Sequence, residues 1–168
     1  MATAKSPIPQ GLHSVTPHLV FENSVAAIDW YKKAFGAEAV APPALGPDGK
    51  VMHAELRIGN SVIYLNDQMG GGKAPQGQGG LPITFWIYTA DVDALFARAV
   101  AAGAKVAPGP MGQLSDQFWG DRCGMVFDPF GFQWALATRK EDLTPEEMNR
   151  RQDEFFKQMA AQGLQQPH

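Results

Sequence analysis

The hydrophobic and polar positions in the first half of the chain follow the order strand, helix, strand, strand, strand. Residues 24–35 carry apolar side chains at helical spacing, with Asn23 or Ser24 as the N-cap and Gly36 as the C-terminal stop. Segments around this helix alternate like half-buried strands, at 14–21, 38–41, 51–58 and 61–65. The Gly59-Asn60 pair between the last two segments is typical of a β-hairpin. The pattern therefore predicts a βαβββ unit.

The second half of the chain repeats this order. Residues 68–80 are rich in Gly and Gln and predict a flexible connection, because such residues bury little apolar surface. The pattern then predicts a strand, a helix that Gly103 stops, and three strands, at 83–89, 92–102, 105–107, 124–127 and 133–137. Adding 67 to the residue numbers moves the first helix onto the second, and adding 71 moves the first hairpin onto the last. Helices that end in Gly also resemble one another by chance, but the shared order of elements favours a duplication.

A third helix is predicted near the C-terminus. Thr144-Pro-Glu-Glu147 supplies an N-cap, a proline at the first helical position and a glutamate at N3, which together form a capping box. An apolar stripe follows at Met148, Phe155, Phe156 and Met159. The stripe needs an apolar partner surface. The chain's own sheet and a second subunit are the two alternatives for this partner.

Composition narrows the function and the compartment. The hydrophobic fraction of 45 % and the charged fraction of 18 % are ordinary for a globular protein. With a net charge of −3 and no basic run, the chain is not expected to bind nucleic acid. No apolar run approaches the roughly 20 residues of a membrane span, and the first residues lack a signal-peptide pattern. The single Cys123 excludes an internal disulfide, and we expect a cytoplasmic protein. We also expect the Cys123 thiol to be inert and buried on a face that packs against a helix.

Four segments carry a resemblance to a known family. They are Ala26–Ala37, Met52–Leu65, Val92–Ala104 and Gln117–Gly131. The most specific of them contains Trp-Gly-Asp-Arg at 119–122 and Asp-Pro-Phe-Gly at 128–131. Over residues 14 to about 150 the chain resembles the PhnB-like branch of the glyoxalase/bleomycin-resistance/extradiol-dioxygenase (vicinal-oxygen-chelate) superfamily. The resemblance implies paired βαβββ modules around an open cleft and a homodimer.

Pattern and resemblance together predict an α+β fold of two tandem βαβββ modules that form an open cleft, with an added C-terminal helix. The expected divisions are a flexible tail at 1–12, the first module at 13–67, a Gly-rich linker at 68–81, the second module at 82–140, and the C-terminal helix and tail at 141–168.

The resemblance also implies where a metal would bind. Metal-dependent members hold one divalent ion with His, Glu or Gln side chains near the first and last strands of each module. Those positions fall at or near Thr16, Tyr64, Thr84 and Ala135. Hydroxyl and methyl groups do not supply the donors that such an ion needs, and a two-residue shift would add only His18. No cofactor is therefore expected, and a divalent metal is disfavoured. Phe132 also stands where related sequences usually have a histidine.

Strand alternation selects the side chains that would line the cleft. Tyr64, Trp86 and Tyr88 are large aromatic residues on the predicted cleft faces, and His18 shares such a face. Aromatic surfaces with polar tips suit a partly apolar ligand that one or two hydrogen bonds orient. The alternative is that these rings only fill the space between the sheets.

His53 and Glu55 are the candidate catalytic residues. Because they are two positions apart on one strand, their side chains lie on the same face, close enough to share a ligand, a water molecule or a metal. A carboxylate beside an imidazole favours its protonated form and suits it to acid or base catalysis. An exposed ladder of polar side chains is the alternative.

The loop before the penultimate strand adds two candidate ligand-binding residues, Trp119 and Arg122. Arg122 could bind an anionic group or tie the loop down through Asp121, Asp116 or Asp128. The polar segment 112–119 has the composition of a flap over the cleft.

Two main hypotheses of function follow. The first is a metal-independent protein that binds a small, partly aromatic or amphipathic molecule between its modules, which explains the aromatic cleft and the missing ligands together. The second is a lyase, isomerase or dioxygenase whose divalent ion is held by some combination of His18, His53 and Glu55. A non-catalytic interaction module is suggested only by the C-terminal helix.

Overall fold

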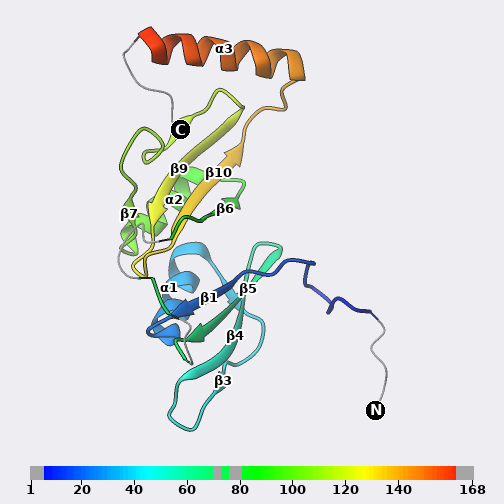
Figure 1. Cartoon of the computed structure of the whole chain (residues 1–168), viewed down its shortest axis with the longest axis vertical. Coiled ribbons are helices and arrows are strands. Elements are labelled where there is room, and N and C mark those ends of the chain that lie inside the picture. The colour runs from blue at the N-terminus through cyan, green and yellow to red at the C-terminus, as the bar shows by residue number, and fades with distance from the viewer. Residues whose placement is uncertain (1–5, 70–72, 76–80, 162–168) are drawn as a thin grey trace.

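The computed structural model describes residues 6–69, 73–75 and 81–161. Its two sheets of five strands follow one another along the long axis of the molecule (Figure 1). The N-terminal segment extends away from the first module, and the C-terminal helix lies across the far end of the second. Most of the predicted Gly-rich linker and the final residues 162–168 lie outside the described residues.

The first module contains one helix and five strands. They are β1 (His18–Phe21), α1 (Ser24–Phe35), β2 (Glu38–Ala39), β3 (Ala44–Leu45), β4 (Val51–Ile58) and β5 (Ser61–Asp67). The sheet order is β1-β5-β4-β2, and β3 also pairs with β4. β1 and β5 run parallel, whereas β4 and β5 form the predicted antiparallel hairpin.

The second module repeats this plan. It contains β6 (Thr84–Tyr88), α2 (Val92–Ala101), β7 (Lys105–Val106), β8 (Ser115–Asp116), β9 (Asp121–Phe127) and β10 (Gln133–Arg139). The sheet order is β6-β10-β9-β7, with β8 on β9, and β6 is parallel to β10. The predicted α+β fold of two tandem modules is thereby confirmed.

The two modules begin their helices in the same way. Asn23 accepts a hydrogen bond from the Ala26 N–H at the start of α1, and Asp91 accepts one from the Ala94 N–H at the start of α2. The last strand of each module also contacts the start of its helix. The Asp67 carboxylate of β5 accepts a hydrogen bond from the Ser24 N–H, and the Thr138 hydroxyl of β10 accepts one from the Val92 N–H. Each module therefore closes its helix onto the end of its own last strand.

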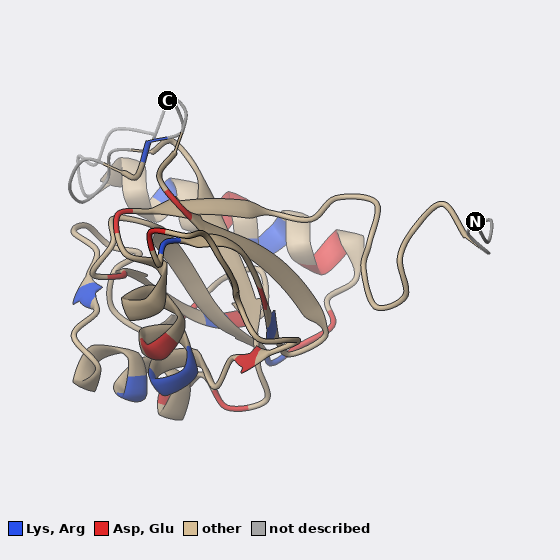
Figure 2. Cartoon of the chain, turned by 90° about the horizontal axis from the view of Figure 1, so that it is seen from below, with Lys and Arg blue, Asp and Glu red and all other residues tan. Residues whose placement is uncertain are grey.

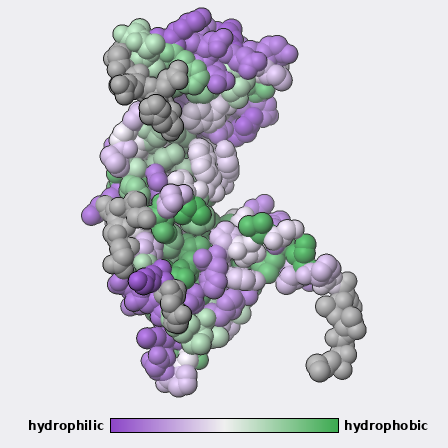
Figure 3. All heavy atoms as spheres, in the orientation of Figure 1, coloured by the Kyte–Doolittle hydropathy of each residue, from purple (hydrophilic) through white to green (hydrophobic). Residues whose placement is uncertain are grey.

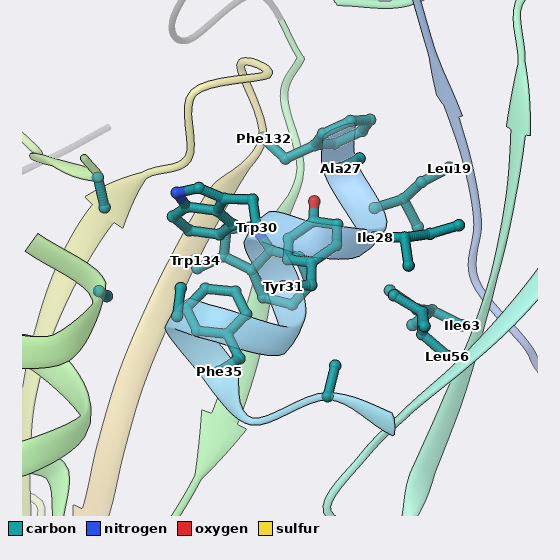
Figure 4. Packing of buried hydrophobic residues seen from close by; sticks show 14 of the residues in the cluster. Leu19, Ala27, Ile28, Trp30, Tyr31, Phe35, Leu56, Ile63, Phe132 and Trp134 are labelled. Carbon is teal, nitrogen blue, oxygen red and sulfur yellow. The ribbon is translucent and has the colours of Figure 1, made fainter. Parts of the chain in front are cut away.

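Helix α1 lies between the two sheets and joins their cores (Figure 4). On one side Ile28 faces Leu56 and Ile63 of the first sheet, all buried. On the other side the Phe35 ring lies 5.0 Å from that of Trp134 in the second sheet. The hydrophobic cluster is continuous across both modules, so the chain folds around one core.

A buried carboxylate links the modules through hydrogen bonds. Asp128 accepts from the Tyr31 hydroxyl at 2.6 Å and from the Trp134 indole N–H at 2.9 Å. It also accepts from the backbone N–H groups of Phe130 and Phe132 at 2.9 Å. Burial raises the pKa of Asp128 even though these bonds oppose the shift. Each hydrogen bond to this carboxylate therefore contributes to the stability of the fold, because no water competes for it.

The C-terminal helix α3 (Pro145–Ala161) begins where the sequence predicts. Thr144 accepts a hydrogen bond from the Glu147 N–H at 3.2 Å, so the first half of the capping box is present. Glu147 does not complete it, because its carboxylate instead binds Arg150 and Arg151, which lower its pKa to about 2.

Helix α3 is held against the second module at few points. The Phe155 ring lies 5.0 Å from that of Phe118, and Arg151 pairs with Glu141 at 2.8 Å. None of the helix residues is fully buried. Among the described residues the predicted apolar stripe thus has one aromatic partner outside the helix, and its side chains are half-buried or, at Phe155, exposed.

Candidate functional site

The predicted catalytic pair belongs to a cluster on the first sheet. We call His18, His53, Glu55 and Tyr64 the histidine cluster. His53 Nε2 lies 3.1 Å from Glu55 Oε1, and the His53 ring lies 4.8 Å from the Tyr64 ring. The strand register explains the grouping, because Tyr64 of β5 is opposite both His18 of β1 and Glu55 of β4.

The histidine cluster can transfer protons but does not fit the metal of the superfamily. Its side chains offer two imidazoles, one carboxylate and one phenol, yet no three His, Cys, Asp or Glu groups in the described part of the chain approach closely enough to hold an ion. At the other expected metal positions, Thr84 donates a hydrogen bond to Gln133, and the methyl group of Ala135 lies between Trp86 and Met125 in the register. This donor set does not match a divalent centre.

The second sheet presents an aromatic face instead. Trp86 and Tyr88 of β6 stack with ring centroids 6.1 Å apart and an angle of 26° between their planes. They are 43 % and 57 % exposed, which is high for such large apolar side chains. Neighbouring positions on β10 are alanines, Ala135 and Ala137, so the two rings stand above a flat floor.

A buried carboxylate, Asp121, orients this aromatic face. It accepts hydrogen bonds from the Tyr88 hydroxyl at 2.9 Å and from the Trp119 indole N–H at 3.1 Å, and Arg139 lies 3.8 Å away. Burial and the hydrogen bond to Asp121 raise the pKa of Tyr88, so its hydroxyl stays protonated. The sequence pattern predicts Asp121 only as a possible partner for Arg122, because the contact with Tyr88 depends on strands that are far apart in the chain.

Arg122 lies on the opposite face of β9. Its guanidinium binds Asp93 with two hydrogen bonds, of 2.7 and 2.9 Å, and Asp116 with one of 3.3 Å. The same face carries Gly124, where a β-carbon would be 2.9 Å from the Phe96 ring of α2. Arg122 therefore ties the loop and strand to α2, and it does not join the other candidate residues.

Cys123 is buried, and burial raises the pKa of its thiol to about 11. Its predicted face is wrong, however. Because Gly124 faces α2, alternation directs Cys123 to the other side of β9, the side of the aromatic face.

A pocket of about 690 Å³ lies at the junction of the two modules. Its walls are residues 12–13 and 15–17, the β4–β5 turn and following strand at 58–63, and β6 with Thr89 at 85–89, closed by Leu95 and Trp134. Figure 3 shows hydrophobic residues gathered at this waist, where the N-terminal segment leaves the body. The volume is typical of a small-molecule site.

Only two of the predicted site residues, Trp86 and Tyr88, line this pocket. His18, His53, Glu55 and Tyr64 stay together on the first sheet, and Trp119 supports Tyr88 through Asp121. The pocket also uses His13 and Thr16 from a segment that the sequence presents as a tail or a strand start. No local sequence pattern predicts that these residues lie against β6. Phe132, at the position of the missing histidine, is buried in the core beside Phe21.

Residues 12–136 match the Glyoxalase/Bleomycin resistance protein/Dioxygenase superfamily. The match covers most of the chain and both modules, so this protein belongs to that superfamily. Within the described residues, none of the helices is both long and apolar enough to span a membrane.

Relatives and solved structures agree with this membership. The uncharacterized protein Mb0911c of Mycobacterium bovis is 44 % identical over 140 residues, which are 80 % of this chain and 89 % of that protein. The crystal structure of TioX from Micromonospora sp. ML1 superposes with a TM-score of 0.59 at 25 % identity, over 76 % of this chain and 98 % of that one. FosX from Listeria monocytogenes, solved with Mn(II) and sulfate, has a TM-score of 0.55 at 17 % identity, over 80 % and 95 % of the chains, and shares the fold.

Proposed function

We propose that this protein binds a small, partly aromatic or amphipathic molecule, and that it does so without the metal of its superfamily. The observation that carries the proposal is the stacked pair Trp86 and Tyr88, half-exposed on the wall of a pocket of about 690 Å³. Exposed aromatic rings cost free energy in water, and a planar ligand stacked on them recovers it. The hydrogen bond from Tyr88 to Asp121 holds one of the two rings in place before the ligand arrives.

The donor set supports binding without a metal. The positions that would supply ligands carry hydroxyl and methyl groups, and the imidazoles of the histidine cluster lie outside the pocket. The likeness to FosX, which was solved with Mn(II), is at 17 % identity and extends to the fold alone.

A second candidate function rests on the histidine cluster. The 3.1 Å contact between His53 and Glu55 is the arrangement of a proton-transfer pair. In this alternative the protein is a lyase, isomerase or dioxygenase that binds a divalent ion through His18, His53 and Glu55, with ligands beyond the described set.

We also propose a cytoplasmic homodimer whose partner is a small molecule and neither nucleic acid nor membrane. Exposed apolar side chains support dimerisation, including Val15 at 83 % exposure and the partly exposed stripe of α3. Sedimentation should give about twice 18.2 kDa, and a monomer at micromolar concentration would contradict this part of the proposal.

Two measurements test the proposed function. Metal analysis of protein purified without chelator should find no stoichiometric manganese, iron, nickel or zinc, and one equivalent of any of them would favour the enzyme. Tryptophan fluorescence should be quenched by an aromatic probe, and Trp86→Phe should reduce the quenching. Unchanged quenching in this variant would remove Trp86 from the site.

A further inference from the structure

The pocket at the module junction has no fixed charge on its walls. Among the lining residues that the structure describes there is no Asp, Glu, Lys or Arg, and His13 is the one histidine. The N-terminal segment that forms one wall contains no Asp, Glu, Lys or Arg from Ser6 to Pro17, and it is uniformly tan in Figure 2. Elsewhere on the surface Figure 2 shows acidic and basic residues intermixed, so the uncharged wall is a local property.

Two carboxylates lie close to β6 in the fold but do not line the pocket. Asp121, behind Tyr88, accepts hydrogen bonds from Tyr88 and Trp119 through Oδ2, and its Oδ1, which makes no hydrogen bond, lies 3.8 Å from Arg139. Asp91, just after the pocket residue Thr89, accepts from the Ala94 N–H as the cap of α2. Arg139 balances the charge of Asp121, and Asp91 stands outside the pocket lining.

The polar groups that face the pocket are neutral. Apart from the aromatic and imidazole side chains, they are the hydroxyls of Thr16, Ser61 and Thr89 and the amide of Asn60. The Ser61 hydroxyl donates to Asn60 at 3.2 Å, and the Thr16 hydroxyl makes only a 3.5 Å contact with the His13 carbonyl. These groups can donate to or accept from a ligand, but they cannot balance a charge.

On these grounds we infer that the pocket selects an uncharged, planar aromatic molecule, with residues 12–17 as part of its binding site. A charged ligand would lose its hydration on entering and would find no opposite charge, whereas a neutral ring loses little and stacks on Trp86 and Tyr88. The inference rests on the proposed function, because it specifies the ligand of the same pocket.

Three matched probes test the selection. They share the naphthalene ring and differ in charge: 1-naphthylmethanol, 1-naphthylmethylammonium and 1-naphthoate. Calorimetric titration of the full chain at about pH 8 should give a dissociation constant for the alcohol roughly tenfold below those of both ions. Equal or tighter binding of either ion would overturn the inference and leave the proposed function standing. Failure of all three probes to bind would remove the proposed function, and the inference with it.

A charge placed on the wall should reverse the preference. Ser61→Asp should strengthen binding of the ammonium probe about tenfold and weaken that of the alcohol, because the new carboxylate faces the ligand. Gln113→Asp, an exposed position outside the pocket, adds the same charge and should leave all three constants unchanged.

Thr16→Asp repeats the charge test outside every helix and strand, and it serves if the strand position Ser61 does not tolerate the change. A shift toward the ammonium probe in this variant would show that residues 12–17 contact the ligand. No shift in a folded Thr16→Asp protein would remove the N-terminal segment from the site.

Discussion

The two modules have the same scaffold but carry opposite chemistry on their sheets. The first presents ionisable groups, His18, His53 and Glu55, around Tyr64, whereas the second presents the stacked rings of Trp86 and Tyr88 and buries its carboxylate behind them. The helix starts and strand order are retained in both. The repeated architecture therefore depends on caps and core residues, while the exposed sheet faces are free to differ.

The modules also differ where they meet. The β4–β5 turn of the first module, Gly59 and Asn60, is exposed, whereas the β9–β10 turn of the second contains Asp128, the buried carboxylate that binds four donors. The turn of the second module thus supplies a buried acceptor for Tyr31 of α1. Corresponding hairpin turns in a duplicated chain can lie at the surface in one copy and carry a core hydrogen-bond acceptor in the other.

The largest effect should come from the buried carboxylate of the second module. Asp128→Ala leaves the Tyr31 hydroxyl, the Trp134 indole and two backbone N–H groups buried without an acceptor, and we expect a loss of about 3–5 kcal/mol in unfolding free energy. Arg57→Ala, which removes an exposed charge from β4 of the first module, should cost less than about 0.5 kcal/mol. Urea denaturation measures both, and similar losses would show that the modules do not differ in this respect.

How far the sequence predicts the structure depends on how local each signal is. Helix α1 is predicted with its observed bounds, because its cap, its apolar spacing and Gly36 are adjacent in the chain. The strands β3 and β8 are missed because they lie in segments with loop composition, one after Pro42 and Pro43 and the other in the polar stretch 112–119. β1 begins at His18 and not at residue 14, and Pro17 precedes it with no N–H to pair.

The site follows the same rule. Alternation along β6 identifies Trp86 and Tyr88 as residues of one face, which the structure shows. The support from Asp121 depends on the pairing of both β6 and β9 with β10, and the wall made by residues 12–17 depends on the path of an irregular segment. Such contacts between distant segments leave no pattern in a single sequence.

The second effect is a difference in pH dependence between Asp67 and Asp128. Burial would raise the pKa of Asp67, but hydrogen bonds from the backbone N–H groups of Ser24 and Val51 outweigh it and lower the pKa. Its stabilisation is therefore complete above the unfolded pKa of about 4 and is lost as the pH falls through the lower folded value. Asp67→Asn should cost roughly 1–2 kcal/mol near pH 7 and progressively less in acid.

Asp128→Asn is the matched control, because the folded pKa of Asp128 is raised. A raised carboxyl pKa gives stability that is present below about pH 4 and is lost as the pH rises through the folded value. Unfolding free energies should be measured between about pH 3 and pH 7 and compared with those of the parent protein. The loss of stability caused by Asp67→Asn should grow as the pH rises, whereas the loss caused by Asp128→Asn should shrink. Parallel changes would contradict the assigned shifts.

The third effect concerns ligand binding by the two sheet faces. Trp86→Ala should weaken binding of a neutral aromatic probe about tenfold, since it removes one of the two stacked rings. Tyr64→Ala makes a comparable truncation on the first sheet and should change the dissociation constant less than about twofold. Calorimetry measures both, and an equal loss in Tyr64→Ala would mean that both faces contact the ligand.

The smallest effect is expected at the pair that looks most catalytic. The side chains of His53 and Glu55 are 44 % and 30 % exposed, so water weakens their interaction. A double-mutant cycle with His53→Ala and Glu55→Ala should give a coupling free energy below about 1 kcal/mol. Neither variant should alter binding of the neutral probe, because neither residue lines the pocket. A larger coupling that grows when divalent metal is added would instead show an ion between the two side chains, and the first module would then carry the metal-dependent chemistry of the second candidate function.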